Sequence, residues 1–221
     1  MKRGGASKDR AIAGLVLLHG RGGSAADMVS MFDTLALPDV AVIAPEAPER
    51  SWWPVSFLAP FSELSAWLDR GLDAVAAAVA ELRSDGLPLN AISICGFSQG
   101  ACLGLEFAAR QGQGLSTVFG FSGALVGTDD AMTGPQADLY GYRGKRFDYA
   151  TELHGLNVEL SCHERDPHIP LARFEESADV LRGLGATVAR RVYPGAGHAL
   201  MREDVMALRH RLNVQISAER S

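Results

Sequence analysis

A serine held between two glycines, in the segment Gly96-Phe97-Ser98-Gln99-Gly100, constrains this chain more than any other feature. An apolar run at residues 91–95 precedes the segment, and a stretch of small residues with helical character follows at 101–110. This pattern predicts a buried strand, a sharp turn and a helix. A serine on such a turn has a strained backbone that flanking glycines permit, and its hydroxyl is lifted above the sheet edge. The segment therefore predicts a serine nucleophile beside a helix N-terminus, where amide hydrogens can face a developing oxyanion.

Apolar, β-branched runs alternate with helical patterns along the rest of the chain. The runs predict strands at residues 12–18, 40–44, 91–95, 117–122, 157–161 and 187–193, and helices at 25–37, 62–84, 99–110, 171–184 and 198–215. The first three strands are almost continuously hydrophobic, which is typical of a parallel sheet covered by helices on both faces. We expect one domain over residues 1–221, an α/β fold with a mostly parallel sheet of six to seven strands. The segment before Ile12 is short and polar, so we expect no leading hairpin.

Two stretches interrupt this alternation, and both follow predicted strands. Residues 45–61 are rich in proline and aromatic side chains, among them Trp52 and Trp53, and residues 127–151 are long and irregular. Open α/β sheets bind ligands at the carboxyl ends of their strands, and long irregular loops there often form lids or pocket walls. We expect Trp52 and Trp53 to belong partly to the core and partly to a substrate pocket, where aromatic rings supply apolar contact area.

A serine hydroxyl needs a neighbouring base, and His198 is the best placed of six histidines. It ends the glycine-rich turn at residues 194–198, directly after the last predicted strand, whereas His210 lies in a predicted helix between arginines. The base in turn needs a carboxylate to orient it. Asp166 is favoured because it follows a predicted strand and gives the chain order Ser, Asp, His. Glu164 competes by proximity, and the weaker alternatives are Asp129, Asp130, Asp138 and Asp148.

An oxyanion site needs two hydrogen-bond donors, and the sequence offers two glycine-bounded turns to supply them. The amide of Gln99, directly after the serine, is the first. The second is expected in the turn His19-Gly20-Arg21-Gly22-Gly23, from the amide of Arg21, with Gly22 as second choice and Gly20 and Gly22 close to bound substrate. A phosphate-binding loop is disfavoured because both common glycine-rich phosphate motifs are missing. His19 is interpreted as a structural member of the turn.

Composition and charge exclude several classes of function. The net charge is −5, which gives no reason to expect a nucleic-acid partner. No apolar run approaches the ~20 residues that cross a bilayer, and residues 1–10 lack the apolar region of a signal peptide. The three cysteines show no paired spacing, so we expect a reducing, cytoplasmic location. Cys162, His163, Asp166 and His168 crowd one segment, but their spacing matches no common metal motif, and we expect no metal and no cofactor.

The motifs together resemble the phospholipase/carboxylesterase family of small α/β-hydrolases, which includes bacterial carboxylesterases and acyl-protein thioesterases. The resemblance is carried by residues 17–23 (LLHGRGG), 45–48 (PEAP), 52–53 (WW), 96–100 (GFSQG), 121–123 (FSG) and 195–198 (GAGH), in the family's order. It implies a triad of Ser98, Asp166 and His198, with the Arg21 and Gln99 amides in the oxyanion hole. The chain departs from the family at Glu164, where members often have glycine, and in the loop from Gly127 onward.

These residues predict a serine carboxylesterase that acts on small or medium acyl or aryl esters. A thioesterase or lysophospholipase would use the same site, and a non-catalytic binding protein on this scaffold is the alternative from another class. Dienelactone hydrolases are disfavoured because they use cysteine at the position of Ser98. The expected partner is a small-molecule ester, without stable membrane insertion; a homodimer is compatible with the sequence, which does not fix the oligomeric state.

Overall fold

A seven-stranded sheet forms the middle layer of the computed structural model, which describes residues 1–130, 145 and 147–220. Its strands are β1 (Lys2–Gly5), β2 (Ala13–Leu18), β3 (Val40–Ala44), β4 (Ile92–Phe97), β5 (Thr117–Phe121), β6 (Asn157–Arg165) and β7 (Thr187–Ala196). They lie in the order β1-β3-β2-β4-β5-β6-β7, with β1 antiparallel to β3 and the other neighbours parallel. The carboxyl ends of β2 and β4 to β7 therefore meet at one edge of the sheet.

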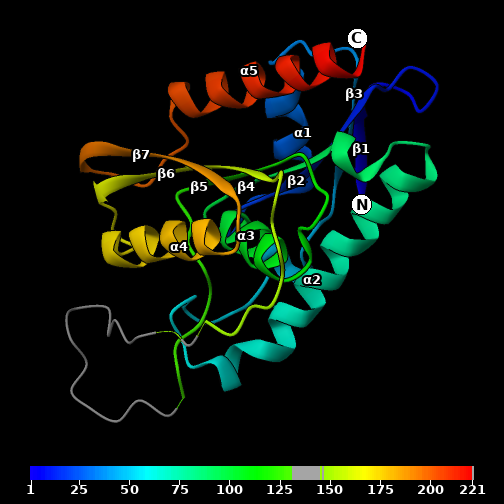
Figure 1. Cartoon of the computed structure of the whole chain (residues 1–221). Helices are drawn as coiled ribbons and strands as arrows, with labels where there is room; N and C mark the ends of the chain where they lie inside the picture. Colours follow the sequence, from blue (N-terminus) through cyan, green and yellow to red (C-terminus); the bar gives the residue numbers. More distant parts are fainter. Residues whose placement is uncertain (131–144, 146, 221) are drawn as a thin grey trace.

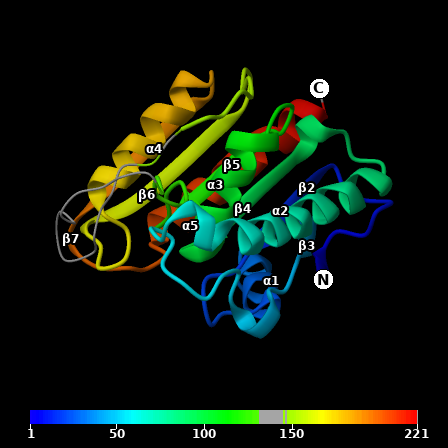
Figure 2. The same cartoon turned by 90° about the horizontal axis from the view of Figure 1, so that it is seen from below.

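Helices cover both faces of this sheet. They are α1 (Ala25–Asp33), α2 (Phe61–Ser84), α3 (Gln99–Gln111), α4 (Leu171–Gly183) and α5 (Arg202–Glu219), with short 3-10 turns η1 (Pro48–Arg50) and η2 (Leu89–Ala91). Helices α1 and α5 pack on one face, and α2, α3 and α4 on the other (Figure 1). In the view from below, α3 lies between α2 and α4 (Figure 2). The parallel sheet with two helical layers is the predicted α/β architecture.

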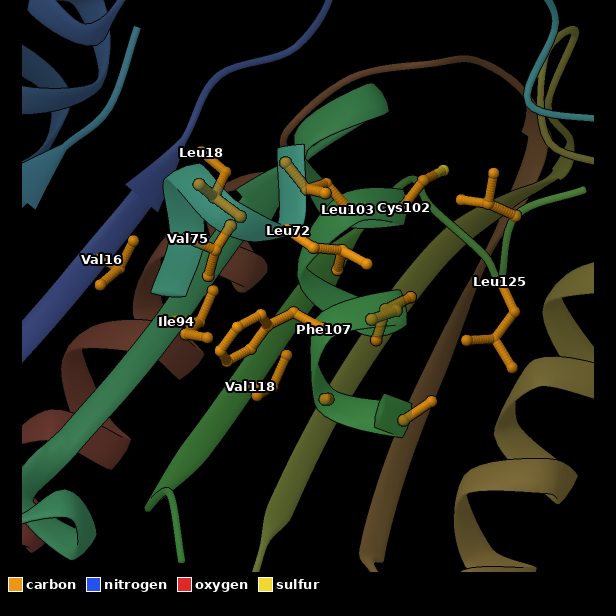
Figure 3. Close-up of a cluster of buried hydrophobic side chains, with 14 of the residues drawn as sticks. Val16, Leu18, Leu72, Val75, Ile94, Cys102, Leu103, Phe107, Val118 and Leu125 are labelled. Atoms are coloured by element: carbon orange, nitrogen blue, oxygen red, sulfur yellow. The ribbon is translucent and has the colours of Figure 1, made fainter. Parts of the chain in front are cut away.

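The larger core lies between the sheet and the layer of α2, α3 and α4. Figure 3 shows side chains of the strands, such as Ile94 and Val118, facing Leu103 and Phe107 of α3. These four side chains are almost completely buried. Full burial of an aliphatic or aromatic side chain contributes about 1.5–3 kcal/mol, so this packing fixes α3 firmly on the central strands. The helix that begins directly after Ser98 is thereby anchored.

No leading hairpin precedes Ile12, but a single short strand does, because β1 pairs with β3 at the edge of the sheet and gives it the seventh strand. Lys2 and Arg3 are exposed, so this strand has no hydrophobic alternation that a sequence pattern could detect. Gly4 faces Val29 of α1 so closely that a Cβ atom would overlap it. Short, charged edge strands of this kind protect a sheet from pairing with other chains.

Two helix boundaries also differ from the prediction. Helix α1 ends at Asp33, although Leu35 and Leu37 beyond it are buried and extended the apolar pattern to residue 37. Ala36 has a φ of 52°, which no α-helix accommodates. Helix α5 begins at Arg202 rather than at residue 198, because Asp204 accepts the Met201 amide at 3.0 Å and caps the helix there. His198 consequently lies on a loop.

Strands β6 and β7 are longer than predicted. β6 continues from residue 161 to Arg165, and β7 from residue 193 to Ala196, with an irregularity in their pairing between His163 and Arg165. The polar residues of these extensions masked the strand signal. The longer strands deliver Asp166 and His198 to the same sheet edge as Ser98.

Candidate active site

Ser98 occupies the sharp turn between β4 and α3. Its φ of 55° and ψ of −120° are unfavourable for any residue other than glycine. A Cβ atom on Gly96 would overlap the Gly100 backbone, and one on Gly100 would overlap the Leu18 carbonyl. The Ser98 amide donates to the Phe121 carbonyl at 2.9 Å, which ties the turn to the end of β5. The two glycines are thus required by close backbone packing, as the sequence pattern predicted.

Three side chains from separate strand ends form one hydrogen-bonded series. His198 Nε2 lies 2.8 Å from Ser98 Oγ, and His198 Nδ1 lies 2.8 Å and 3.0 Å from the two carboxylate oxygens of Asp166. His198 follows β7, Asp166 follows β6, and Ser98 follows β4. A serine, an imidazole and a buried carboxylate at these distances can transfer a proton from the hydroxyl to the ring.

The Asp166 carboxylate is held by its own loop as well as by the imidazole. Its Oδ1 accepts the amides of His168 at 2.8 Å and Ile169 at 3.0 Å. Burial alone would raise the pKa of Asp166, but the hydrogen bonds from His198, His168 and Ile169 outweigh burial and lower that pKa. Asp166 therefore stays ionised at neutral pH and is fixed to face Nδ1 of His198.

The other carboxylates considered from the sequence lie elsewhere. Glu164 is exposed and accepts the Gly195 amide at 3.2 Å. Asp130 accepts from the amide and hydroxyl of Ser62 at the start of α2, and Asp129 and Asp148 line a second cavity. Asp138 lies outside the described residues. Among the carboxylates that the structure describes, Asp166 is the one in contact with His198.

Two backbone amides are available beside Ser98. Gln99 is the first residue of α3, where a helix leaves its amides without intrahelical acceptors. The Arg21 amide has no acceptor within the described part of the chain, and Arg21 lines the same cavity as Ser98. The Gly22 amide instead donates to the Arg50 carbonyl at 2.8 Å, which disfavours Gly22 as the alternative donor. The geometry leaves the Arg21 and Gln99 amides as the candidate pair.

His19 lies inside the neighbouring turn and contacts backbone. Its Nδ1 is 2.8 Å from the Gly20 carbonyl, and its Nε2 accepts the Ala47 amide at 3.1 Å. The ring stacks on Trp52 at 5.2 Å between centroids. With Nε2 accepting, Nδ1 carries the proton and donates to Gly20, which agrees with the structural interpretation of His19.

A cavity of about 550 Å³ opens in front of Ser98 and His198. Most of its wall is apolar or aromatic, and its lining residues are Gly20, Arg21, Trp53, Pro54, Val55, Ser56, Phe57, Leu58, Phe97, Ser98, Gln99, Cys102, Pro167, His168, Ile169 and His198. Gly20 and Trp53 are among the lining residues. Trp52 and Gly22 are not, so the cavity does not support their expected role in substrate binding: Trp52 is buried, with its indole donating to the His19 carbonyl at 2.9 Å.

The side chains of Arg21 and Gln99 hold the cavity wall in place. The Arg21 guanidinium donates to the carbonyls of Trp53, Pro54 and Val55. The Gln99 carboxamide donates to the Trp53 carbonyl at 2.8 Å and accepts the Trp52 amide at 2.9 Å. The same two residues thus supply the candidate pair of amides and, through their side chains, hold the backbone of residues 52–55.

Sequence reasoning also missed several lining residues. Cys102 lies one helical turn after Ser98 and lines the cavity while it is buried in the core. Burial raises the pKa of its thiol to about 12, so the thiolate is not populated at neutral pH. Its spacing of four residues on one helix was the available signal. His168, two residues after Asp166, had been weighed only as a metal ligand.

The other residues of the segment 162–168, which were weighed as metal ligands, lie in separate environments. The ring of His163 packs against Tyr193, with 5.4 Å between centroids, and Cys162 is buried in β6. Asp166 is bound to His198 and two amides.

In the described part of the chain, no helix is both long and apolar enough to span a membrane.

A mostly parallel sheet with a serine on the turn after a central strand, and with aspartate and histidine following later strands, is the α/β-hydrolase fold. Comparison with known proteins places the chain more narrowly. It belongs to the phospholipase/carboxylesterase family, whose model matches residues 5–137. This is a hydrolase family of esterase and thioesterase type.

Individual relatives agree with this placement. A phospholipase/carboxylesterase structure from Dyadobacter fermentans is 33% identical, with a TM-score of 0.82, and the alignment covers 96% of this chain and 95% of that one. An acyl-protein thioesterase 1 from Gibberella zeae is 29% identical over 121 residues, which are 54% of this chain and 46% of that relative. The chain thus matches about half the length of this curated relative. The structure of esterase PE8, at 21% identity, covers 96% of this chain and 97% of that one with a TM-score of 0.73, and shows the shared fold.

Proposed function

We propose that this protein is a serine carboxylesterase that cleaves carboxylic esters through a covalent acyl-enzyme. The observation that carries the proposal is the hydrogen-bonded series from Ser98 through His198 to Asp166, with distances of 2.8 Å at both ring nitrogens. It lies at the carboxyl edge of the sheet and opens to a mainly apolar cavity, which suits a small or medium acyl or aryl group.

The geometry supports a two-step reaction. Ser98 Oγ attacks the ester carbonyl while His198 Nε2 accepts its proton, and Asp166 stabilises the resulting imidazolium. The amides of Arg21 and Gln99 donate hydrogen bonds to the oxyanion. As the tetrahedral intermediate collapses, the proton on Nε2 passes to the leaving alkoxide, and the alcohol departs. Water, activated by the same imidazole, then hydrolyses the acyl-serine and regenerates the hydroxyl.

Hydrolysis of p-nitrophenyl butyrate by Ser98→Ala tests this function. The variant should lose activity by at least about 10³-fold, because the nucleophile is gone while the fold is intact. Ser84→Ala is the matched control: Ser84 lies at the end of α2 and does not line the cavity, so this variant should match the wild type. Activity retained in a folded Ser98→Ala protein would exclude the assignment.

A thioesterase is the second candidate, favoured by the match to an acyl-protein thioesterase. The same nucleophile, base and oxyanion donors would serve a thioester, and a lysophospholipid ester would use them too. Paired butanoyl esters and thioesters of equal length compare the leaving atoms directly. A series of acyl lengths then reports the pocket, since each additional buried methylene contributes about 0.8 kcal/mol.

A non-catalytic binding protein on the same scaffold is the remaining alternative. It is disfavoured because the strained serine, the oriented imidazole and the buried carboxylate have no evident use in simple binding. It predicts that Ser98 does not react with a fluorophosphonate, whereas a serine hydrolase reacts at that residue.

A further inference from the structure

His168 is the imidazole in the cavity wall that the proposed reaction does not use. Its side chain is exposed, and its ring packs edge-to-face against His198, with 4.7 Å between centroids and 77° between planes. Its amide donates to Asp166 at 2.8 Å, so its backbone is fixed by the carboxylate that orients His198. The position of the His168 ring is therefore tied to that of the proton-transferring ring.

The other polar side chains of the wall already have partners there. Arg21 donates to wall carbonyls, and Gln99 binds the backbone of Trp52 and Trp53. Ser56 Oγ accepts the Leu58 amide at 3.2 Å. Within residues 1–130, 145 and 147–220, neither ring nitrogen of His168 has a hydrogen-bond partner. A neutral imidazole carries one donor and one acceptor, so the His168 ring, which lines the cavity, can hydrogen-bond a group bound there.

The reaction geometry decides which part of the ester approaches this ring. His198 Nε2 must come within about 2.6–3.2 Å of the leaving oxygen to protonate it. The alcohol portion attached to that oxygen therefore lies against His198, and so within reach of the ring that packs on His198. The oxyanion faces the Arg21 and Gln99 amides instead.

We propose that His168 is a specificity-determining residue that hydrogen-bonds a hydroxyl group in the alcohol portion of the ester. The preferred substrates are then esters of polyhydroxylated alcohols, in which a hydroxyl near the ester oxygen donates to the acceptor nitrogen of the imidazole or accepts from its N–H. This inference rests on the proposed ester hydrolysis at Ser98.

The test compares two esters that share one acyl group, 1-butanoylglycerol and ethyl butanoate, by pH-stat measurement of kcat/KM. His168→Phe keeps an aromatic ring and removes both hydrogen-bonding atoms, and His168→Gln keeps a donor and an acceptor. The ratio of kcat/KM for the glycerol ester to that for the ethyl ester should fall about tenfold in His168→Phe, the upper range for one lost hydrogen bond. His168→Gln should restore the ratio to within about threefold of the wild type.

His210→Phe is the matched control, because His210 is an exposed residue of α5 outside the cavity. It should leave the ratio as in the wild type. An unchanged ratio in His168→Phe overturns the inference, as does an equal loss for both esters, which would indicate that the ring only supports His198. If the folded wild type hydrolyses neither ester, the proposed function fails as well. Hydrolysis of the ethyl ester with an unresponsive ratio refutes the role of His168 alone.

Discussion

Ser98 depends on a backbone conformation that its flanking glycines make accessible. The positive φ of the serine is maintained because β4, α3 and the end of β2 meet at Gly96 and Gly100 without room for side chains. Such strain persists only where the surrounding structure determines it. The position of the Ser98 side chain is thus determined by backbone packing at the two glycines that flank it.

Gly96→Ala should therefore destabilise the protein, by about 1–3 kcal/mol or more, because its methyl group overlaps the Gly100 backbone. Gly183→Ala is the control: Gly183 ends α4, and a Cβ atom there meets nothing within 4 Å. That substitution should be neutral or stabilising by up to about 1 kcal/mol. Urea unfolding of both variants measures the difference. Equal stability of the two variants would contradict the packing argument.

The charge of Asp166 contributes to stability and, in the proposed reaction, to activity. Its folded-state pKa is lowered, so as pH falls the unfolded chain, with a carboxyl pKa of about 3.9, takes up the proton first. The stabilising contribution is therefore full above that unfolded value and is lost as pH falls through the lower folded one. Near neutral pH the carboxylate remains charged beside His198.

Asp166→Asn tests both consequences. Ester hydrolysis should fall by about 10³- to 10⁴-fold, since the amide cannot fix the tautomer of His198 or stabilise its cation. Below about pH 4, the unfolding free energy of the variant should decrease less steeply than that of the wild type, because the variant lacks this titration. Urea unfolding from pH 3 to pH 6 measures the slopes. Parallel pH profiles would show that Asp166 is not a source of acid stability.

At the scale of elements, a buried charge on α3 holds the chain that follows β5. Glu106 is fully buried and accepts from Lys145 at 2.8 Å, Arg110 at 3.0 Å, the Tyr149 hydroxyl at 2.7 Å and the Val126 amide at 2.7 Å. Burial would raise the pKa of Glu106, but the charges of Lys145 and Arg110 and these hydrogen bonds lower it. The helix that begins after Ser98 is thereby tied to Val126, Lys145 and Tyr149.

Glu106→Gln should destabilise the protein by about 3–5 kcal/mol, because the buried Lys145 ammonium loses its counter-charge. Lys145→Met should also destabilise it, whereas the double variant should lose less than the sum of the two single losses. Urea unfolding at pH 7 of all four proteins forms a double-mutant cycle. A Glu106→Gln protein as stable as the wild type, or strictly additive losses, would show that the pair is not coupled.

At the scale of the whole molecule, sequence reasoning reached the features that a local pattern encodes. The buried strands β2 to β5 are continuous apolar runs, so their positions along the chain were predictable. Glycines mark the turn at Ser98, so the place of this serine at the sheet edge was predictable too. Chain order singled out Asp166 and His198, and the structure brings both into hydrogen-bond contact with the predicted partners.

The remaining features depend on tertiary contacts without a local signal. Strand β1 is polar and exists because β3 offers a free edge. Gly22 and Trp52 were expected to contact substrate. In the structure, the Gly22 amide donates to the Arg50 carbonyl, and Trp52 is buried in the core. Which residues face the cavity follows from the packing of α3 and of residues 53–58 around Ser98. His168 comes into contact with His198 only because β6 and β7 run side by side.

The account requires that Ser98, among all serines of the chain, is the activated nucleophile. Its most direct test is the mass of the intact protein after treatment with a fluorophosphonate, with peptide mapping of the modified site. The wild type should gain one phosphonyl group at Ser98, and His198→Ala should gain it at least about 10³-fold more slowly because the base is removed. A folded wild-type protein that stays unmodified, or that is modified at another residue, would contradict the account.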